Sequence, residues 1–239
     1  PVSAPFTITV NSVNDRPTIS LNPLSDIDED AGMQTVNGFA EFAVGADNES
    51  GQTIDSFLIT GLNNPGLFTP TGQPAIDKNS GDLSYTPATH ANGAVTFNVA
   101  VRDTGGGDDT SAALPATFTI NAVNDPPVIT LPMTAPMGPE DAPLTIAAIS
   151  VSDVDAGTES LLVNLSIKAG SISLFQGSGL AFNDIDGTDG SLEFFGSQSS
   201  LTSALQTGIN FVPPLDFHGV LVLNVTVNDQ GKNGNGGAL

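Results

Sequence analysis

The chain of 239 residues is long enough for one large domain or two of ordinary size, and its 26 acidic and 5 basic side chains give a net charge of −21. Such a charge attracts cations and repels nucleic acid, so we expect no nucleic-acid partner. The chain has no cysteine, which excludes disulfides and thiolate-bound zinc or iron–sulfur sites. No apolar run reaches the roughly 20 residues that span a bilayer, so we expect no membrane insertion.

In chain order, the expected elements are almost all short β-strands between glycine- and proline-containing turns. Alternating or apolar segments predict strands over 39–45, 53–60, 83–86, 95–102, 114–121, 144–152, 160–168, 191–195, 208–212 and 221–227. One short helix is expected over 201–206, with Ser199 or Ser200 as its N-cap. The fold class that follows is all-β, with Greek-key sandwiches.

The acidic residues recur at matched positions, which divides the chain into two copies of one unit. Asn14-Asp15 before a proline recurs at 124–126, and Glu29 with its neighbours recurs at Glu140. Early landmarks differ by 110 or 111 positions and late ones by 126. The second copy therefore carries an insertion of about fifteen residues, expected within 195–208. We expect the last strand of a preceding repeat over 1–13, a first repeat over 14–123, and a second repeat over 124–239 that lacks its last strand.

The first residues resemble the strand that closes the first repeat, since Phe-Thr-Ile occurs at 6–8 and again at 118–120. An open sandwich edge invites pairing with another strand. Segment 4–10 of one molecule could fill the open edge of another and give strand-swapped self-association. The simpler alternative is that both ends stay unpaired.

Several motifs resemble those of cadherin-like repeats, in the tandem form found in very large secreted bacterial adhesins. Segment 76–83 is similar to the family turn of an apolar residue, Asp, any residue, an acid, Ser or Thr, Gly, any residue and Leu, and 186–192 has the same spacing. The segments 47–49 and 153–155 are similar to its acid-x-acid loop. The Asn-Asp pairs are similar to its linker. The resemblance covers nearly the whole chain.

This resemblance implies tandem cadherin- or immunoglobulin-like sandwiches with Ca²⁺ at each junction. At the internal junction it implies the ligands Glu29, Asp77, Asn124, Asp125, Asp153, Asp155 and Asp229. Half-sites would remain at Asn14, Asp15, Asp47, Glu49 and Asp103 of the first repeat, and at Glu140 and Asp186 of the second. Asn79 is a candidate ligand that stands where the family usually has an acid, so one or two ions are expected. Calcium suits such a set because it accepts about six to eight oxygens in irregular geometry.

Three classes of function compete. The first is a calcium-rigidified extracellular repeat of a large bacterial surface or secreted adhesin, which acts as a stalk and in adhesion beside neighbouring repeats of its parent chain. The second is a carbohydrate-binding accessory module of a secreted protein that acts on polysaccharide, although such modules usually present an aromatic platform and this chain has no Trp and one Tyr. The third is a glycosidase with two catalytic carboxylates. Metal binding already explains the repeated acids, so we expect no enzyme.

Overall fold

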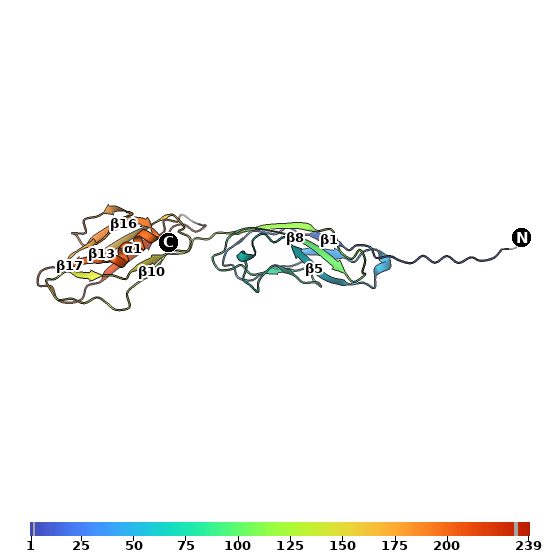
Figure 1. The fold of residues 1–239 in the computed structure, drawn as a ribbon, viewed down its shortest axis with the longest axis horizontal. Coiled ribbons are helices and arrows are strands. Elements are labelled where there is room, and N and C mark those ends of the chain that lie inside the picture. Colours follow the sequence, from blue (N-terminus) through green and yellow to red (C-terminus); the bar gives the residue numbers. More distant parts are fainter. Residues whose placement is uncertain (2, 232–233) are drawn as a thin grey trace. The chain divides into compact units, whose positions relative to one another are not determined.

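The structure of the chain, a computed structural model, describes residues 1, 3–231 and 234–239, with the backbone but not the side chain of Asp47. It contains two compact units, Pro1–Ala122 (unit 1) and Val123–Leu239 (unit 2), each with its own apolar core (Figure 1). The regular elements of both units are almost all β-strands. No helix among the described residues is long and apolar enough to cross a membrane.

Unit 1 is a sandwich of short sheets. Its largest sheet has the order β2 (Ile27–Asp28), β9 (Leu114–Asn121), β8 (Gly93–Asp103) and β5 (Ile54–Thr60). A second sheet has the order β3 (Gln34–Val36), β7 (Leu83–Tyr85) and β6 (Ala75–Ile76), and β1 (Thr18–Leu21) pairs with β4 (Ala40–Ala43). Two 3₁₀ turns, η1 (Asp47–Glu49) and η2 (Pro65–Leu67), lie in the loops. The alternating side chains of β8, including Val95 and Phe97, are fully buried between the sheets, as period-two alternation predicts.

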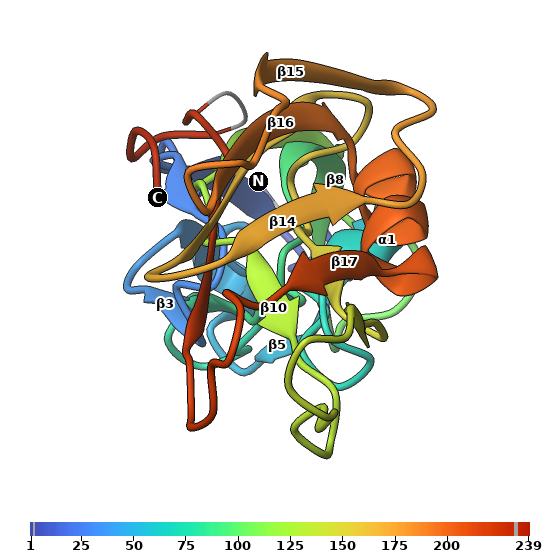
Figure 2. The ribbon, with the colours of Figure 1, turned by 90° about the vertical axis from the view of Figure 1, so that its left-hand side faces the viewer.

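Unit 2 repeats this plan with additions. Its largest sheet has the order β15 (Leu180–Asp184), β16 (Ser191–Ser197), β13 (Ser160–Ile167) and β18 (Leu223–Asn228). The other sheets are β11 (Leu144–Ile146), β17 (Ile209–Val212) and β14 (Ser171–Leu174), and the pair β10 (Val128–Thr130) and β12 (Ser150–Ser152). The helix α1 (Gln198–Thr207) buries Leu201 and Leu205, and β14 lies alongside β17 (Figure 2).

Strand pairing shows which elements correspond between the units. The sheet β3–β7–β6 has the same pairing as β11–β17–β14, and the pair β5–β8 corresponds to β13–β18. Only residues 77–82 lie between β6 and β7, whereas β15, β16 and α1 all lie between β14 and β17. The insertion in unit 2 is therefore larger than the one expected within 195–208. It contains the strands β15 and β16 as well as the helix α1.

The all-β fold class and most predicted strands are confirmed. Two local predictions are wrong. The expected strand over 144–152 is two strands, β11 and β12, because the backbone turns at Ala148 with a φ of 62°. The helix begins before 201, and its N-cap is Ser197, whose hydroxyl accepts a hydrogen bond of 3.3 Å from the Ser200 N–H. Residues 3–13 lie in no strand, so their origin as the last strand of a preceding repeat stays a prediction.

Candidate metal centre

Oxygen-bearing side chains gather at one end of unit 1. Asn14 and Asp15 lie just before β1, Glu49 ends η1, Gln52 follows it, and Asp103 ends β8. The Asp15 N–H donates to Glu49 Oε1 at 2.5 Å, and the Gln52 N–H donates to the Glu49 carbonyl at 2.8 Å. These five residues form what we call the unit 1 cluster.

Several oxygens of the unit 1 cluster are buried without a hydrogen-bond partner. They are Asn14 Oδ1, Glu49 Oε2, Gln52 Oε1 and Asp103 Oδ2. Glu49 is 5% exposed and Asp103 only 2%. No ion pair of the described residues reaches either carboxylate, since the nearby arginines pair with Asp108 and Asp109 instead. Buried charges without a counter-charge cost several kcal/mol, so this arrangement favours a bound cation.

Two glycines leave room for these oxygens to converge. A Cβ built on Gly105 would lie 1.7 Å from Asn14 Oδ1 and 2.5 Å from Gln52 Oε1. A Cβ on Gly45 would lie 2.1 Å from Glu49 Oε2. A larger side chain at either position would collide with these oxygens, so the present arrangement requires both glycines.

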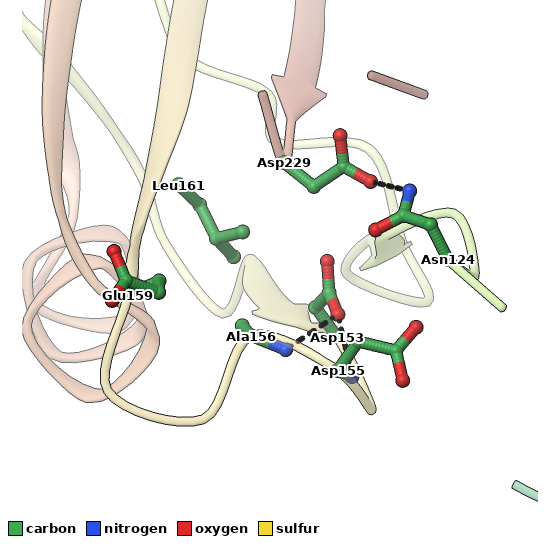
Figure 3. A pocket seen from close by; sticks show the side chains of 7 residues that line it. All are labelled: Asn124, Asp153, Asp155, Ala156, Glu159, Leu161 and Asp229. Atoms are coloured by element: carbon green, nitrogen blue, oxygen red, sulfur yellow. Dashed lines mark hydrogen bonds between the residues drawn. The ribbon is translucent and has the colours of Figure 1, made fainter. Parts of the chain in front are cut away.

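A corresponding group in unit 2 lines a small pocket beside the start of that unit (Figure 3). The unit 2 cluster consists of Asn124, Asp125, Asp153, Asp155 and Asp229, with Glu159 at the pocket wall. Asn124, Asp153 and Asp229 are each less than a tenth exposed. Asp153 Oδ1 accepts the backbone N–H groups of Asp155 at 2.8 Å and Ala156 at 2.9 Å, while Asp153 Oδ2 is buried without a partner.

The same hydrogen-bond pattern fixes both clusters. The Asp125 N–H donates to Asp155 Oδ2 at 2.6 Å, as the Asp15 N–H does to Glu49. The Gly231 N–H donates to Asp229 Oδ1 at 2.9 Å, and the Gly105 N–H donates to Asp103 Oδ1 at the same distance. Backbone donors thus hold one oxygen of each carboxylate and orient its second oxygen.

Asp229 is held in its ionised form despite its burial. Burial is the largest influence on its pKa and raises it. Hydrogen bonds from the Leu239 N–H, the Asn124 side chain and the Gly231 N–H together outweigh burial and lower the pKa below its ordinary value. A carboxylate that stays ionised inside the protein is a suitable cation ligand.

Asp77 and Asp186, which belong to neither cluster, have a different local role. Asp77 Oδ1 accepts the N–H groups of Asn79 and Ser80, and Asp186 Oδ1 accepts the N–H and hydroxyl of Thr188. Both therefore close Asx turns. Asp77 lies between β6 and β7, whereas Asp186 lies between β15 and β16, so the expected equivalence of these turns is wrong.

Three further predicted ligands are assigned to neither cluster. Glu29 is 4% exposed, and its Oε2 accepts a hydrogen bond of 3.1 Å from the Asn92 side chain. Glu140 is exposed in a turn, and the side chain of Asp47 lies outside the described residues. The combination of Glu29 and Asp77 with the unit 2 cluster stays a prediction. Gln52 was not foreseen, because an uncharged amide carries no signal in a search for recurring acids.

The donor atoms suit a hard cation. Carboxylate and amide oxygens make up both clusters, and neither contains histidine or cysteine. Oxygen donors of this kind bind Ca²⁺ and Mg²⁺, whereas zinc prefers nitrogen and sulfur. The mixed amide and carboxylate set, on irregular loops, fits calcium better than the strict octahedron of magnesium.

Comparison with protein-family models finds no match, and comparison with curated proteins finds none either. Among solved structures the chain is similar to Drosophila N-cadherin EC1-3, with 15% identity, a TM-score of 0.32, and coverage of 95% of this chain and 65% of that one. Protocadherin gamma B2 domains 1-5 give 15% identity, a TM-score of 0.35, and coverage of 76% and 32%. The D00-D0 domain of intimin gives 11% identity, a TM-score of 0.30, and coverage of 88% and 98%. The chain thus spans less than two thirds of either cadherin chain, and scores this low carry no argument about function.

Proposed function

We propose that the chain is a calcium-binding pair of repeats from a large extracellular adhesin, in which bound calcium stiffens the connection between repeats. One observation carries the proposal: the same backbone hydrogen bonds hold buried carboxylates in both clusters, and among the described residues four buried oxygens of the unit 1 cluster and one of the unit 2 cluster, Asp153 Oδ2, have no hydrogen-bond partner. Solubility alone explains exposed acids, but it does not explain buried ones held in matched geometry.

Calcium binding would act on the connecting backbone. Asn124 and Asp125 belong to the unit 2 cluster and directly follow Ala122 and Val123, where unit 2 begins along the chain. An ion held by these residues would restrict the backbone torsions of the linker. Extracellular calcium modules typically bind with Kd values of about 10⁻⁴–10⁻³ M, so a millimolar concentration would occupy such sites.

A stalk follows from this arrangement when several repeats are joined. Neighbouring repeats of the parent chain are then the immediate partners, and the adhesive surface can lie elsewhere on that chain. The extracellular location belongs to the same proposal, because millimolar free calcium is found there and not in the cytosol.

Calcium titration by calorimetry tests the proposal with charge-matched variants. Glu49→Gln removes the charge of a buried carboxylate whose Oε2 has no hydrogen-bond partner, and Glu41→Gln makes the same change at an exposed position of β4. Asp153→Asn and the exposed Asp216→Asn form the corresponding pair in unit 2. We expect Glu49→Gln and Asp153→Asn each to weaken one site about tenfold or more, a cost of about 1.4 kcal/mol or more, and the control variants to bind as the parent does.

Equal affinity in all four variants would show that calcium, if bound, is held elsewhere. Saturable binding to a glycan array without any calcium dependence would instead favour the carbohydrate-binding alternative.

A further inference from the structure

The helix α1 packs against the strand that leads into the unit 2 cluster. The strand β12 ends at Ser152, and Asp153 follows it directly. Among the described residues β12 pairs with β10 on one side, and no strand pairs with its other side. Val151 of β12 is 2% exposed and belongs to the same apolar core as Leu201 and Leu205 of the helix. The backbone that precedes Asp153 is thus packed against α1.

Two polar side chains of α1 complete the hydrogen bonding of this backbone. The Thr202 hydroxyl donates to the Val151 carbonyl at 2.9 Å and accepts the Val151 N–H at 3.3 Å. Gln198 Oε1 accepts the Asp153 N–H at 2.8 Å. Val151 and Asp153 are two positions apart along the chain, as are residues of a strand whose polar groups point to the same side. The two side chains therefore take the place that a neighbouring strand would have.

The Asp153 carboxylate depends on the position of the same backbone. Its Oδ1 accepts the N–H groups of Asp155 at 2.8 Å and Ala156 at 2.9 Å, while its Oδ2 is buried without a partner among the described residues. Asp153, Asp155 and Asp229 line the same pocket. A shift of the Asp153 backbone would therefore move Oδ2 away from the other oxygens of the cluster and disturb the loop that carries Asp155.

Unit 1 reaches the corresponding position without such a helix. The strand β4 pairs with β1 as β12 pairs with β10, but residues 44–46 separate β4 from η1. The insertion is also missing, since only residues 77–82 lie between β6 and β7. The Ala40 N–H at the start of β4 donates instead to the Gly81 carbonyl at 2.9 Å. The contacts of Gln198 and Thr202 are therefore a feature of unit 2 and not of unit 1.

We propose that Gln198 and Thr202 are positioning residues of the unit 2 calcium site, an inference that rests on the proposed function because it concerns the same cluster. The two side chains hold the Asp153 backbone where Oδ2 can bind the ion. The described lining of the pocket includes neither side chain, so both act through the backbone of β12 and Asp153. Removal of a group that orients a metal ligand typically lowers metal affinity about 10–100-fold. The insertion that contains α1 then contributes to ion binding.

Calcium titration by calorimetry of the full chain tests this role in the Glu49→Gln background, in which the unit 1 cluster is weakened. Gln198→Met removes the oxygen acceptor and keeps an unbranched side chain, and Thr202→Val removes the hydroxyl and keeps the shape. Each should weaken calcium binding by unit 2 about tenfold. Gln206→Met makes the first change at an exposed position of the same helix and should bind as the background protein does.

Conservative variants separate the hydrogen bonds from the packing of the helix. Thr202→Ser keeps a hydroxyl and Gln198→Glu keeps an oxygen acceptor, so each should bind calcium much more tightly than Thr202→Val or Gln198→Met. Amide hydrogen exchange of the calcium-free protein provides a second readout. Gln198→Met should speed exchange of the Asp153 N–H, and Thr202→Val should speed exchange of the Val151 N–H, because each loses its acceptor.

Thermal unfolding in the presence of a chelator shows whether unit 2 is folded in each variant at the temperature of the titration. A helix that only stabilised the fold would leave the Kd unchanged wherever unit 2 remains folded. If Gln198→Met does not fold, the comparison of Thr202→Val with Thr202→Ser decides the question.

Equally tight binding by the background protein, Gln198→Met and Thr202→Val would overturn this inference and leave the proposed function intact. Equal weakening by Gln206→Met would also overturn it, because a general loss of helix packing would then be responsible. A parent chain that binds no calcium would overturn the proposed function and this inference with it.

Discussion

At the scale of single residues, the two oxygens of one carboxylate have separate roles. In Asp103, Oδ1 accepts the Gly105 N–H at 2.9 Å, while Oδ2 is buried without a partner. Glu49 and Asp153 divide their oxygens in the same way. The backbone fixes the first oxygen and so positions the second before any ion arrives. Such preorganisation would reduce the entropy lost on binding the ion that we propose.

Gly105 provides a steric prediction. Gly105→Ala would place a methyl group 1.7 Å from the present position of Asn14 Oδ1, so the amide must move away from the cluster. We expect calcium affinity at the unit 1 cluster to fall about tenfold or more, in line with the cost of about 1–3 kcal/mol for overpacking. Gly51→Ala adds a methyl group where no atom lies within 4 Å and serves as the control. Calorimetry of both variants measures the difference, and unchanged affinity in Gly105→Ala would contradict the assigned site.

Asp77 provides a prediction about pH. Hydrogen bonds from the backbone of Ser80, and then of Asn79, lower the pKa of Asp77 below its ordinary value of 3.8. A lowered pKa in the folded state means that the ionised group stabilises the fold above pH 3.8, and that this stability is lost as the pH falls through the folded pKa. Asp77→Ala should therefore be less stable than the parent at pH 6, and the gap should shrink below the ordinary pKa. Urea unfolding at pH 6 and at a pH below 3.8 measures this difference in stability. A difference that does not change with pH would contradict the assignment.

The described charged residues of both clusters were predicted as ligands from the sequence. The uncharged Gln52 was not predicted, and Asp186 was wrongly matched to Asp77. Asp103 ends a strand with clear alternation and Asp229 directly follows one, so their recurrence was visible. Gln52 has no charge and no counterpart in the acid pattern. Asp186 was matched to Asp77 because each is followed by Gly after four residues and by Leu after six. Such a spacing specifies a turn and not its place in the fold.

At the scale of elements, prediction succeeded where a strand has one buried face. Strands β8, β9 and β13 are eight or more residues long, largely alternate between buried side chains and intermediate or exposed ones, and were each predicted. The strands β2, β6 and β14, of two to four residues, were not predicted, because they carry too few alternations. The break between β11 and β12 depends on a positive φ at Ala148, a residue type that gives no turn signal.

The start of α1 provides a prediction at this scale. Ser197→Ala removes the hydroxyl that accepts the Ser200 N–H and should destabilise unit 2 by about 1 kcal/mol. Ser199→Ala changes an exposed serine inside the helix and should have a much smaller effect, since alanine has the higher helix propensity. Thermal unfolding of both variants measures the difference. An equal loss of stability in the two variants would contradict the assignment of Ser197 as the N-cap.

At the scale of the whole molecule, two separate cores imply two separable unfolding events. Unit 1 packs around residues such as Phe39 and Leu83, and unit 2 around Leu165 and Phe194, with neither cluster containing residues of the other unit. A ligand that binds only the folded state adds about 2.7 kcal/mol when its concentration is 100 times its Kd. Removal of calcium with a chelator should therefore lower both melting transitions.

Differential scanning calorimetry can assign each transition to a unit. In Glu49→Gln the unit 1 transition should lose its response to calcium, while the unit 2 transition keeps it. A calcium response that disappears from both transitions together would indicate one shared site in place of two.

The hydrogen bonds at the start of unit 2 also have a mechanical consequence. Tension along the chain enters this unit at Asn124 and Asp125, which are tied to Asp229 and Asp155, 105 and 30 positions further on. A pull on the linker must shear these ties before it can peel any strand from the sheets. An ion bound by these same residues would cross-link the start of unit 2 to the loops after β12 and β18. The calcium concentration would then determine the force at which the unit begins to unfold.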